Sequence, residues 1–123
     1  MIKEILYVGA GSALGGIARF LINRGFMTFF HHPFPLATFL VNISGSFLIG
    51  YLYSSSLKHE WLTSSLLLFL ITGICGGYTT FSAFSYENVM LVRNGHFPIS
   101  ILYIFASLIL GIGAALAGFW LGK

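Results

Sequence analysis

The chain has 123 residues, of which 57% are hydrophobic and only 7% are charged. Soluble domains carry about 25% charged residues, so this composition excludes an ordinary soluble protein and indicates one that lies in lipid. The formal net charge is +3, but the basic residues are scattered, which excludes the basic run that a nucleic-acid-binding surface needs.

Apolar stretches of membrane-spanning length follow one another along the chain. A hydrocarbon core about 30 Å thick needs about 20 residues of helix. We therefore predict an all-α membrane protein with four transmembrane helices, in which residues 1–123 form a single domain. The predicted spans are Ile5–Asn23, Leu36–Ser55, Leu62–Val92 and Phe97–Leu121.

The first span is interpreted as a retained anchor, because its apolar run is too long for a signal peptide and further spans follow. Arg19 lies near the end of this span, where a guanidinium can extend to the lipid headgroups. The next segment, Gly25–His32, is too short to cross the membrane, and we predict an interfacial turn or helix there.

The second span contains a polar stripe. Thr38, Asn42 and Gly45 follow at helical spacing, with Ser46 beside them. Asn42 is the most costly of these side chains to leave without a partner in lipid. Its amide therefore predicts either a hydrogen bond between helices or a binding site.

The third stretch is too long for one straight helix. Its 31 residues would extend roughly 46 Å, well beyond the hydrocarbon core. We predict a broken helix, with one half ending near Ile74, the other beginning near Thr80, and Cys75–Thr79 irregular between them. Thr79 or Thr80 is predicted to cap the second half. The alternative is a kink softened by glycine that binds nothing.

Aromatic and hydroxyl side chains follow the predicted break. Phe81 and Phe84 share a helix face, and either pack in lipid or turn their positive ring edges toward a small anion. Tyr103 and Ser107 form a hydroxyl stripe on the last span. Glu87 is the only carboxylate inside a span, which favours passive permeation of an anion over a proton-coupled pump.

The loop charges give no clear orientation. One side would carry Lys3, Lys58 and Lys123, and the other Arg24 and Arg93 with Arg19 nearby. Both orientations are therefore predicted to form, and two oppositely inserted copies would pair as an antiparallel homodimer. Small residues spaced by four, such as Gly11 with Gly15, favour close helix packing.

The sequence resembles the Fluc (CrcB) fluoride channels over essentially its whole length. The residues that carry the resemblance are Gly15-Gly16 with Arg19-Phe20, Thr38-Phe39-Leu40-Val41-Asn42 with Gly45 and Gly50, and Gly76-Gly77-Tyr78-Thr79-Thr80-Phe81-Ser82 with Phe84-Ser85. The resemblance implies a passive, electrogenic fluoride channel that relieves fluoride toxicity, in the inner membrane of a prokaryote. It also implies an antiparallel dimer with two pores, each lined by both subunits.

The resemblance also implies roles for individual residues. The pore positions would be Asn42, Phe81, Phe84, Thr38, Ser82, Tyr103 and Ser107. The backbone carbonyls of Gly76 and Thr79 would hold a structural sodium ion at the dimer interface. Arg19 would concentrate anions in a vestibule. Glu87 matches an acid near one end of the pore, or serves as a salt-bridge partner.

Other classes of protein remain as alternatives. A small multidrug exporter shares the length and the number of spans but needs a carboxylate in the first span, and Ile5–Asn23 has none. A non-conducting scaffold would explain the glycines but not the combination of Asn42, Phe81 and Phe84. No motif for a nucleotide or a catalytic nucleophile is present, so an enzyme is not expected.

Overall fold

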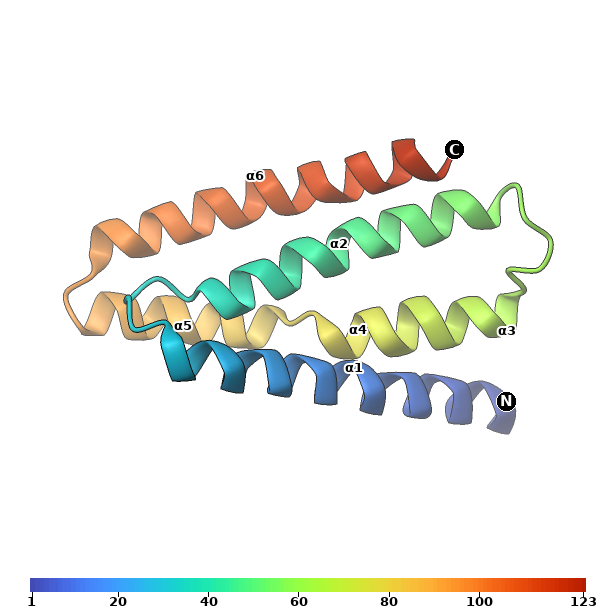
Figure 1. Cartoon of the computed structure of the whole chain (residues 1–123), viewed down its shortest axis with the longest axis horizontal. Helices are drawn as coiled ribbons and strands as arrows, with labels where there is room; N and C mark the ends of the chain where they lie inside the picture. Colours follow the sequence, from blue (N-terminus) through green and yellow to red (C-terminus); the bar gives the residue numbers. More distant parts are fainter.

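The computed structural model describes every residue, 1–123, and contains helices and short connections but no strand. Four helical segments are long and apolar enough to cross a membrane, which confirms the predicted all-α membrane fold (Figure 1). The third of these segments, Ser64–Arg93, consists of four consecutive helical pieces, namely α3, η1, α4 and α5. The elements are α1 (Ile2–Phe29), α2 (Leu36–Ser56), α3 (Ser64–Leu67), η1 (Leu68–Cys75), α4 (Gly76–Tyr78), α5 (Phe81–Arg93) and α6 (Phe97–Gly122).

Both termini lie at the same end of the molecule as the connection from α2 to α3 (Figure 1). The other connections, from α1 to α2 and from α5 to α6, lie at the opposite end. Lys58 confirms this arrangement, because its Nζ donates a hydrogen bond to the backbone oxygen of Lys123. The basic residues are therefore divided between the two ends as the predicted spans required.

The first helix is longer than predicted. We expected it to end near Asn23 with an interfacial segment after it, but α1 continues to Phe29. The sequence has no proline until Pro33, and a glycine such as Gly25 weakens a helix without ending it. The last turns of α1 are also supported by contact between the rings of Phe26 and Phe29, 5.2 Å apart.

The break in the third span is shorter than predicted and lies further along the chain. We expected Cys75–Thr79 to be irregular, but the helix continues through Tyr78, and only Thr79 and Thr80 have extended backbone. The preceding turns, η1, are a π-helix, which is a wide helix often found at functional sites. The prediction for residues 75–78 was therefore wrong, because the glycines of this segment are stabilised by packing against α1.

The two threonines of the break close the helix ends on either side. Thr79 Oγ1 donates to Cys75 O at 2.8 Å, which adds a second hydrogen bond to a carbonyl that already accepts from Thr79 N. Thr80 is the N-cap of α5, because its Oγ1 accepts a hydrogen bond from Ala83 N at 3.1 Å. The predicted cap is confirmed, and it is Thr80.

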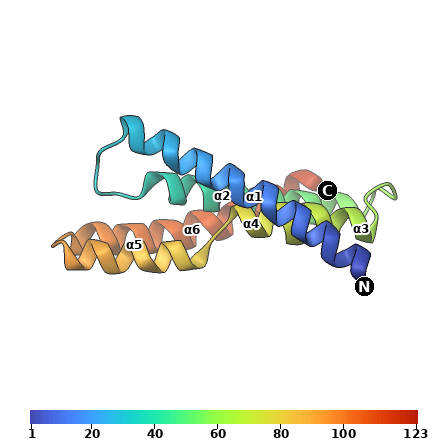
Figure 2. The ribbon, with the colours of Figure 1, turned by 90° about the horizontal axis from the view of Figure 1, so that it is seen from below.

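Glycines allow close backbone contact within two pairs of helices. A Cβ atom added to Gly11 in α1 would lie 2.4 Å from Phe69 O, and one added to Gly118 in α6 would lie 2.1 Å from Phe47 O in α2. Only glycine permits such close approach. As a result α1 packs against η1 and α4, and α2 packs against α6. Figure 2 shows α1 diverging from α5 beyond the break.

Candidate functional site

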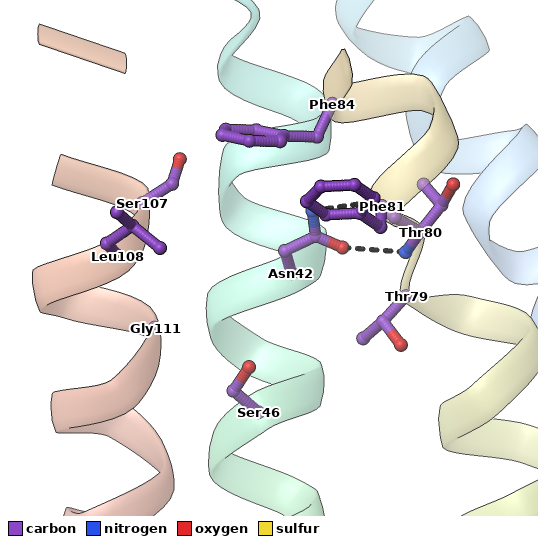
Figure 3. Close-up of a pocket in the computed structure, with 9 residues that line it drawn as sticks. All are labelled: Asn42, Ser46, Thr79, Thr80, Phe81, Phe84, Ser107, Leu108 and Gly111. Atoms are coloured by element: carbon purple, nitrogen blue, oxygen red, sulfur yellow. Dashed lines mark hydrogen bonds between the residues drawn. The ribbon is translucent and has the colours of Figure 1, made fainter. Parts of the chain in front are cut away.

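The extended residues of the break are held by Asn42, which projects from α2. Asn42 Oδ1 accepts a hydrogen bond from Thr80 N at 2.9 Å, and Asn42 Nδ2 donates one to Thr80 O at 3.0 Å (Figure 3). The side-chain amide thus replaces the helical partners that the break removed from this backbone. The sequence predicted that Asn42 makes either a hydrogen bond between helices or a binding site, and the hydrogen bond is present. One Nδ2 hydrogen is not used by these bonds.

Beside this amide lies a hollow of about 280 Å³, which we call the break hollow. Its lining comes from α2, α5, α6 and the break itself. The lining residues are Asn42, Ser46, Thr79, Thr80, Phe81, Phe84, Ser107, Leu108 and Gly111. The structure therefore brings together four of the predicted pore residues, namely Asn42, Phe81, Phe84 and Ser107.

The two phenylalanines line the hollow together. Their ring centroids are 5.8 Å apart, with the ring planes inclined by 39°. Phe84 points from α5 toward α6 (Figure 3). Its ring centroid lies 4.9 Å from that of Tyr103 in α6. Phe81 is 78% exposed, so a large apolar ring at the entrance of the hollow has almost no cover from its own chain. This side of the hollow is open.

Ser107 supplies a polar atom with no partner in the chain. Its Oγ is buried and makes no hydrogen bond. A buried hydroxyl without a partner costs free energy, so such an atom in a cavity indicates a site for a polar ligand. Beyond it, Gly111 continues the hollow without a side chain, and a Cβ atom added there would meet nothing within 4 Å. The polar lining thus contains donors and no formal charge.

Two other predicted pore residues, Thr38 and Tyr103, lie outside the break hollow. Their hydroxyls donate instead to the two carboxylate oxygens of Glu87, at 2.7 Å from Thr38 and 2.8 Å from Tyr103. We call these three residues the Glu87 cluster. Thr38 is 2% and Tyr103 0% exposed, so both hydroxyls are shielded from solvent. The salt bridge considered for Glu87 is absent, and hydroxyls occupy both of its oxygens.

Ser82 and Arg19 lie near the break but do not line the hollow. Ser82 Oγ is 3.1 Å from Thr80 Oγ1, on the exposed first turn of α5. Arg19 Nε donates to Gly77 O at 3.3 Å, which attaches the half-buried guanidinium to the last turn before the break. Arg19 therefore contacts protein backbone of the broken span.

The predicted sodium ligands lie where the first half of the broken span ends. In an unbroken α-helix Gly76 O would accept from Thr80 N, but that N–H donates to Asn42 instead. Gly76 O has thus lost its helical partner, and the helix end directs partial negative charge toward it. Carbonyl oxygens suit a hard cation such as sodium. No group of three or more His, Cys, Asp or Glu side chains offers another metal site.

Several contacts were not predicted from the sequence. Ser46 was placed beside the polar stripe but not among the predicted pore residues, and it lines the hollow one helical turn beyond Asn42. The contact from Arg19 to Gly77 and the pair of hydrogen bonds between Asn42 and Thr80 join residues far apart in the chain. No local pattern reports such a contact.

Fold and site together define a small multi-pass membrane protein with an uncharged, partly polar hollow between its helices. Comparison with known proteins identifies the family. A family model described as "CrcB-like protein, Camphor Resistance (CrcB)" matches residues 6–119, and the chain belongs to this family.

Bacterial relatives resemble the chain over nearly its whole length. A protein named "Fluoride-specific ion channel FluC" from Azobacteroides pseudotrichonymphae is 42% identical over 119 residues, which is 97% of this chain and 95% of that protein. Proteins of the same name are 41% identical over 121 residues in Flavobacterium psychrophilum and 43% identical over 120 residues in Gloeothece citriformis. Each alignment covers at least 97% of both chains in these two cases.

Proposed function

We propose that this chain is a fluoride-selective ion channel that exports fluoride passively and electrogenically, and so relieves fluoride toxicity. The relatives that carry the name of a fluoride-specific channel match this chain nearly from end to end. The protein performs transport and not catalysis, and its four spans place it as a multi-pass protein in the inner membrane of a prokaryote.

The observation that carries the proposal is the uncharged lining of the break hollow. A small anion that leaves water needs donors to replace its hydration. The hollow offers the free Nδ2 hydrogen of Asn42, the unpartnered hydroxyl of Ser107 and the ring edges of Phe81 and Phe84. No Lys or Arg lines the hollow, so the anion is stabilised without a fixed cation that would retain it.

The working unit is an antiparallel homodimer with two fluoride pores, each lined by both subunits. The open side of the break hollow supports this arrangement, because Phe81 is 78% exposed there and a second copy would cover it. A separate hollow of about 740 Å³ between α1 and α2, lined almost entirely by apolar side chains, offers further surface for a partner. The nearly balanced charges at the two ends suit insertion in both directions.

A sodium ion at the dimer interface would be held by the carbonyls of Gly76 and Thr79 from both subunits. The loss of the helical partner of Gly76 O supports this assignment. Sodium would supply positive charge to stabilise the helix ends and takes no part in conduction. Thermal unfolding of the purified protein tests it. Sodium is expected to raise the midpoint at equal ionic strength, relative to N-methylglucamine, and equal midpoints would contradict the assignment.

Purified protein in liposomes tests the channel itself. Vesicles loaded with potassium fluoride are diluted into fluoride-free medium, and valinomycin is added to carry the compensating charge. A channel releases fluoride only after valinomycin is added, because its transport is electrogenic. Proton-coupled uptake of organic cations would indicate an exporter, and absence of any flux from assembled protein would indicate a scaffold.

A further inference from the structure

The Glu87 cluster lies at the point where helices α2, α5 and α6 approach one another. Each carboxylate oxygen of Glu87 accepts one hydroxyl, from Thr38 at 2.7 Å and from Tyr103 at 2.8 Å. A carboxylate carries no proton, so both protons in these bonds belong to the hydroxyls. Short contacts of this kind to a charged oxygen are stronger than bonds between neutral groups.

These bonds change what the last helix offers to an anion. A hydroxyl has a single proton. Once that proton is donated in a hydrogen bond to Glu87, only the lone pairs of the hydroxyl oxygen face other directions. Tyr103 lies one turn from Ser107 on α6, yet Ser107 has a free hydroxyl and Tyr103 does not. The series of donors that begins in the break hollow therefore stops at Tyr103.

A neutral side chain at position 87 would make one of these hydroxyl protons available again. A protonated carboxyl, or a glutamine in its place, has a hydrogen to donate to one of the two hydroxyl oxygens. The proton of that hydroxyl would then be free to turn toward an anion. Loss of the negative charge would also remove its repulsion of the anion.

We infer that Glu87 is a positioning residue that controls the donor path. As a carboxylate it holds the protons of Thr38 and Tyr103 away from the anion, and as a neutral group it releases one of them. This inference rests on the proposed fluoride channel. It predicts that conduction increases when Glu87 is neutral.

The surroundings of Glu87 contain few other groups that change charge. Glu87 borders two cavities, of about 330 Å³ and 180 Å³, at the end of the molecule where α1 joins α2. Neither cavity is lined by Lys or Arg. The titratable groups that face them are His31, His32, His96 and Tyr86, and Tyr103 bonds to Glu87 from α6. Histidine also changes charge between about pH 5 and 8, so the histidines need their own control.

The test is valinomycin-dependent fluoride efflux from liposomes at several pH values. Vesicles without protein are measured at each pH, and their leak of hydrogen fluoride is subtracted. Wild-type flux is expected to rise by up to about fivefold as the pH falls from about 7 to 4, through the ordinary titration range of a glutamate, because one hydroxyl donor is released. Glu87→Gln is expected to show the higher flux throughout and no dependence on pH.

Matched variants separate Glu87 from other causes. Glu60→Gln makes the same change in an exposed connection and is expected to behave as wild type. A variant that combines His31→Gln, His32→Gln and His96→Gln is expected to keep the response to pH. Loss of the response in that triple variant would overturn the inference, because the histidines would then be the titrating groups.

Other outcomes are equally decisive. A flat wild-type pH profile would overturn the inference without any variant, so the test does not depend on how well Glu87→Gln folds. An assembled Glu87→Gln that keeps the wild-type profile, or that conducts less, would also overturn it. If the wild type releases no fluoride at any pH, the channel proposal itself fails, which is a different result.

Discussion

Replacing Asn42 by Asp is the sharpest test of the uncharged lining, because the change turns one donor into an acceptor, adds a negative charge and alters almost no volume. Asp keeps an oxygen to accept from Thr80 N, now 2.9 Å from Asn42 Oδ1. Its second oxygen takes the place of Nδ2, which lies 3.0 Å from Thr80 O. Two acceptors then face each other, and the donor available to an anion is lost.

The expected effect on flux follows from charge. A fluoride about 4 Å from the new carboxylate would be repelled by about 4 kcal/mol at the effective dielectric constant of a partly buried site. Since 1.4 kcal/mol corresponds to a factor of ten, flux should fall by about a thousandfold. The lost bond to Thr80 O costs about 1–3 kcal/mol of stability in addition.

Asn42→Ala is the matched comparison, because it removes the same donor without adding charge. Its flux is expected to fall by only about tenfold, which corresponds to one hydrogen bond. Both variants are measured by fluoride efflux from liposomes, with size-exclusion chromatography to confirm that the protein is assembled. The reasoning would be refuted if assembled Asn42→Asp conducted as well as Asn42→Ala, because charge would then play no part.

Three further substitutions test the ring, the free hydroxyl and the helix contact. Phe81→Ile should reduce fluoride efflux by about tenfold, since it removes a ring edge from the break hollow. Ser107→Ala should also reduce efflux by about tenfold and leave the thermal midpoint unchanged, because its hydroxyl makes no hydrogen bond within the chain. Gly118→Ala should lower stability by about 1–3 kcal/mol in thermal unfolding, because its Cβ would lie 2.1 Å from Phe47 O. Gly113→Ala is the control, since a Cβ there meets nothing within 4 Å.

For each of these substitutions, one result would contradict the prediction. Wild-type efflux from Phe81→Ile would mean that the ring only packs against lipid or a partner. A large drop in the thermal midpoint of Ser107→Ala would mean that its hydroxyl has a structural partner. Equal stability of Gly118→Ala and Gly113→Ala would mean that α2 and α6 can separate at no cost.

The sequence determined the number of spans and the position of the unusual segment. Apolar length alone required four helices, and a third stretch too long for the membrane required a break within it. The same reasoning placed the break several residues too early. Local glycine content favoured an irregular segment at Cys75–Thr79, whereas contact with α1 keeps that segment helical up to Tyr78.

The candidate site was predicted unevenly. Helical spacing was enough to group Phe81 with Phe84, because neighbours on one face of a helix stay neighbours in any fold. The same argument grouped Tyr103 with Ser107, yet the structure divides them, since Tyr103 bonds to Glu87 and Ser107 lines the break hollow. Which hydroxyl is free depends on a carboxylate from another helix.

The sequence by itself therefore determined the environment, the helices and the kinds of group available, because hydrophobicity and helical period are properties of neighbouring residues. Only the tertiary structure decided the partner of each polar group. Asn42 and Thr80 are 38 residues apart, and Thr38 and Glu87 are 49 apart. Hydrogen bonds across such separations form when packing brings helices together, and this packing sets which donors remain for an ion.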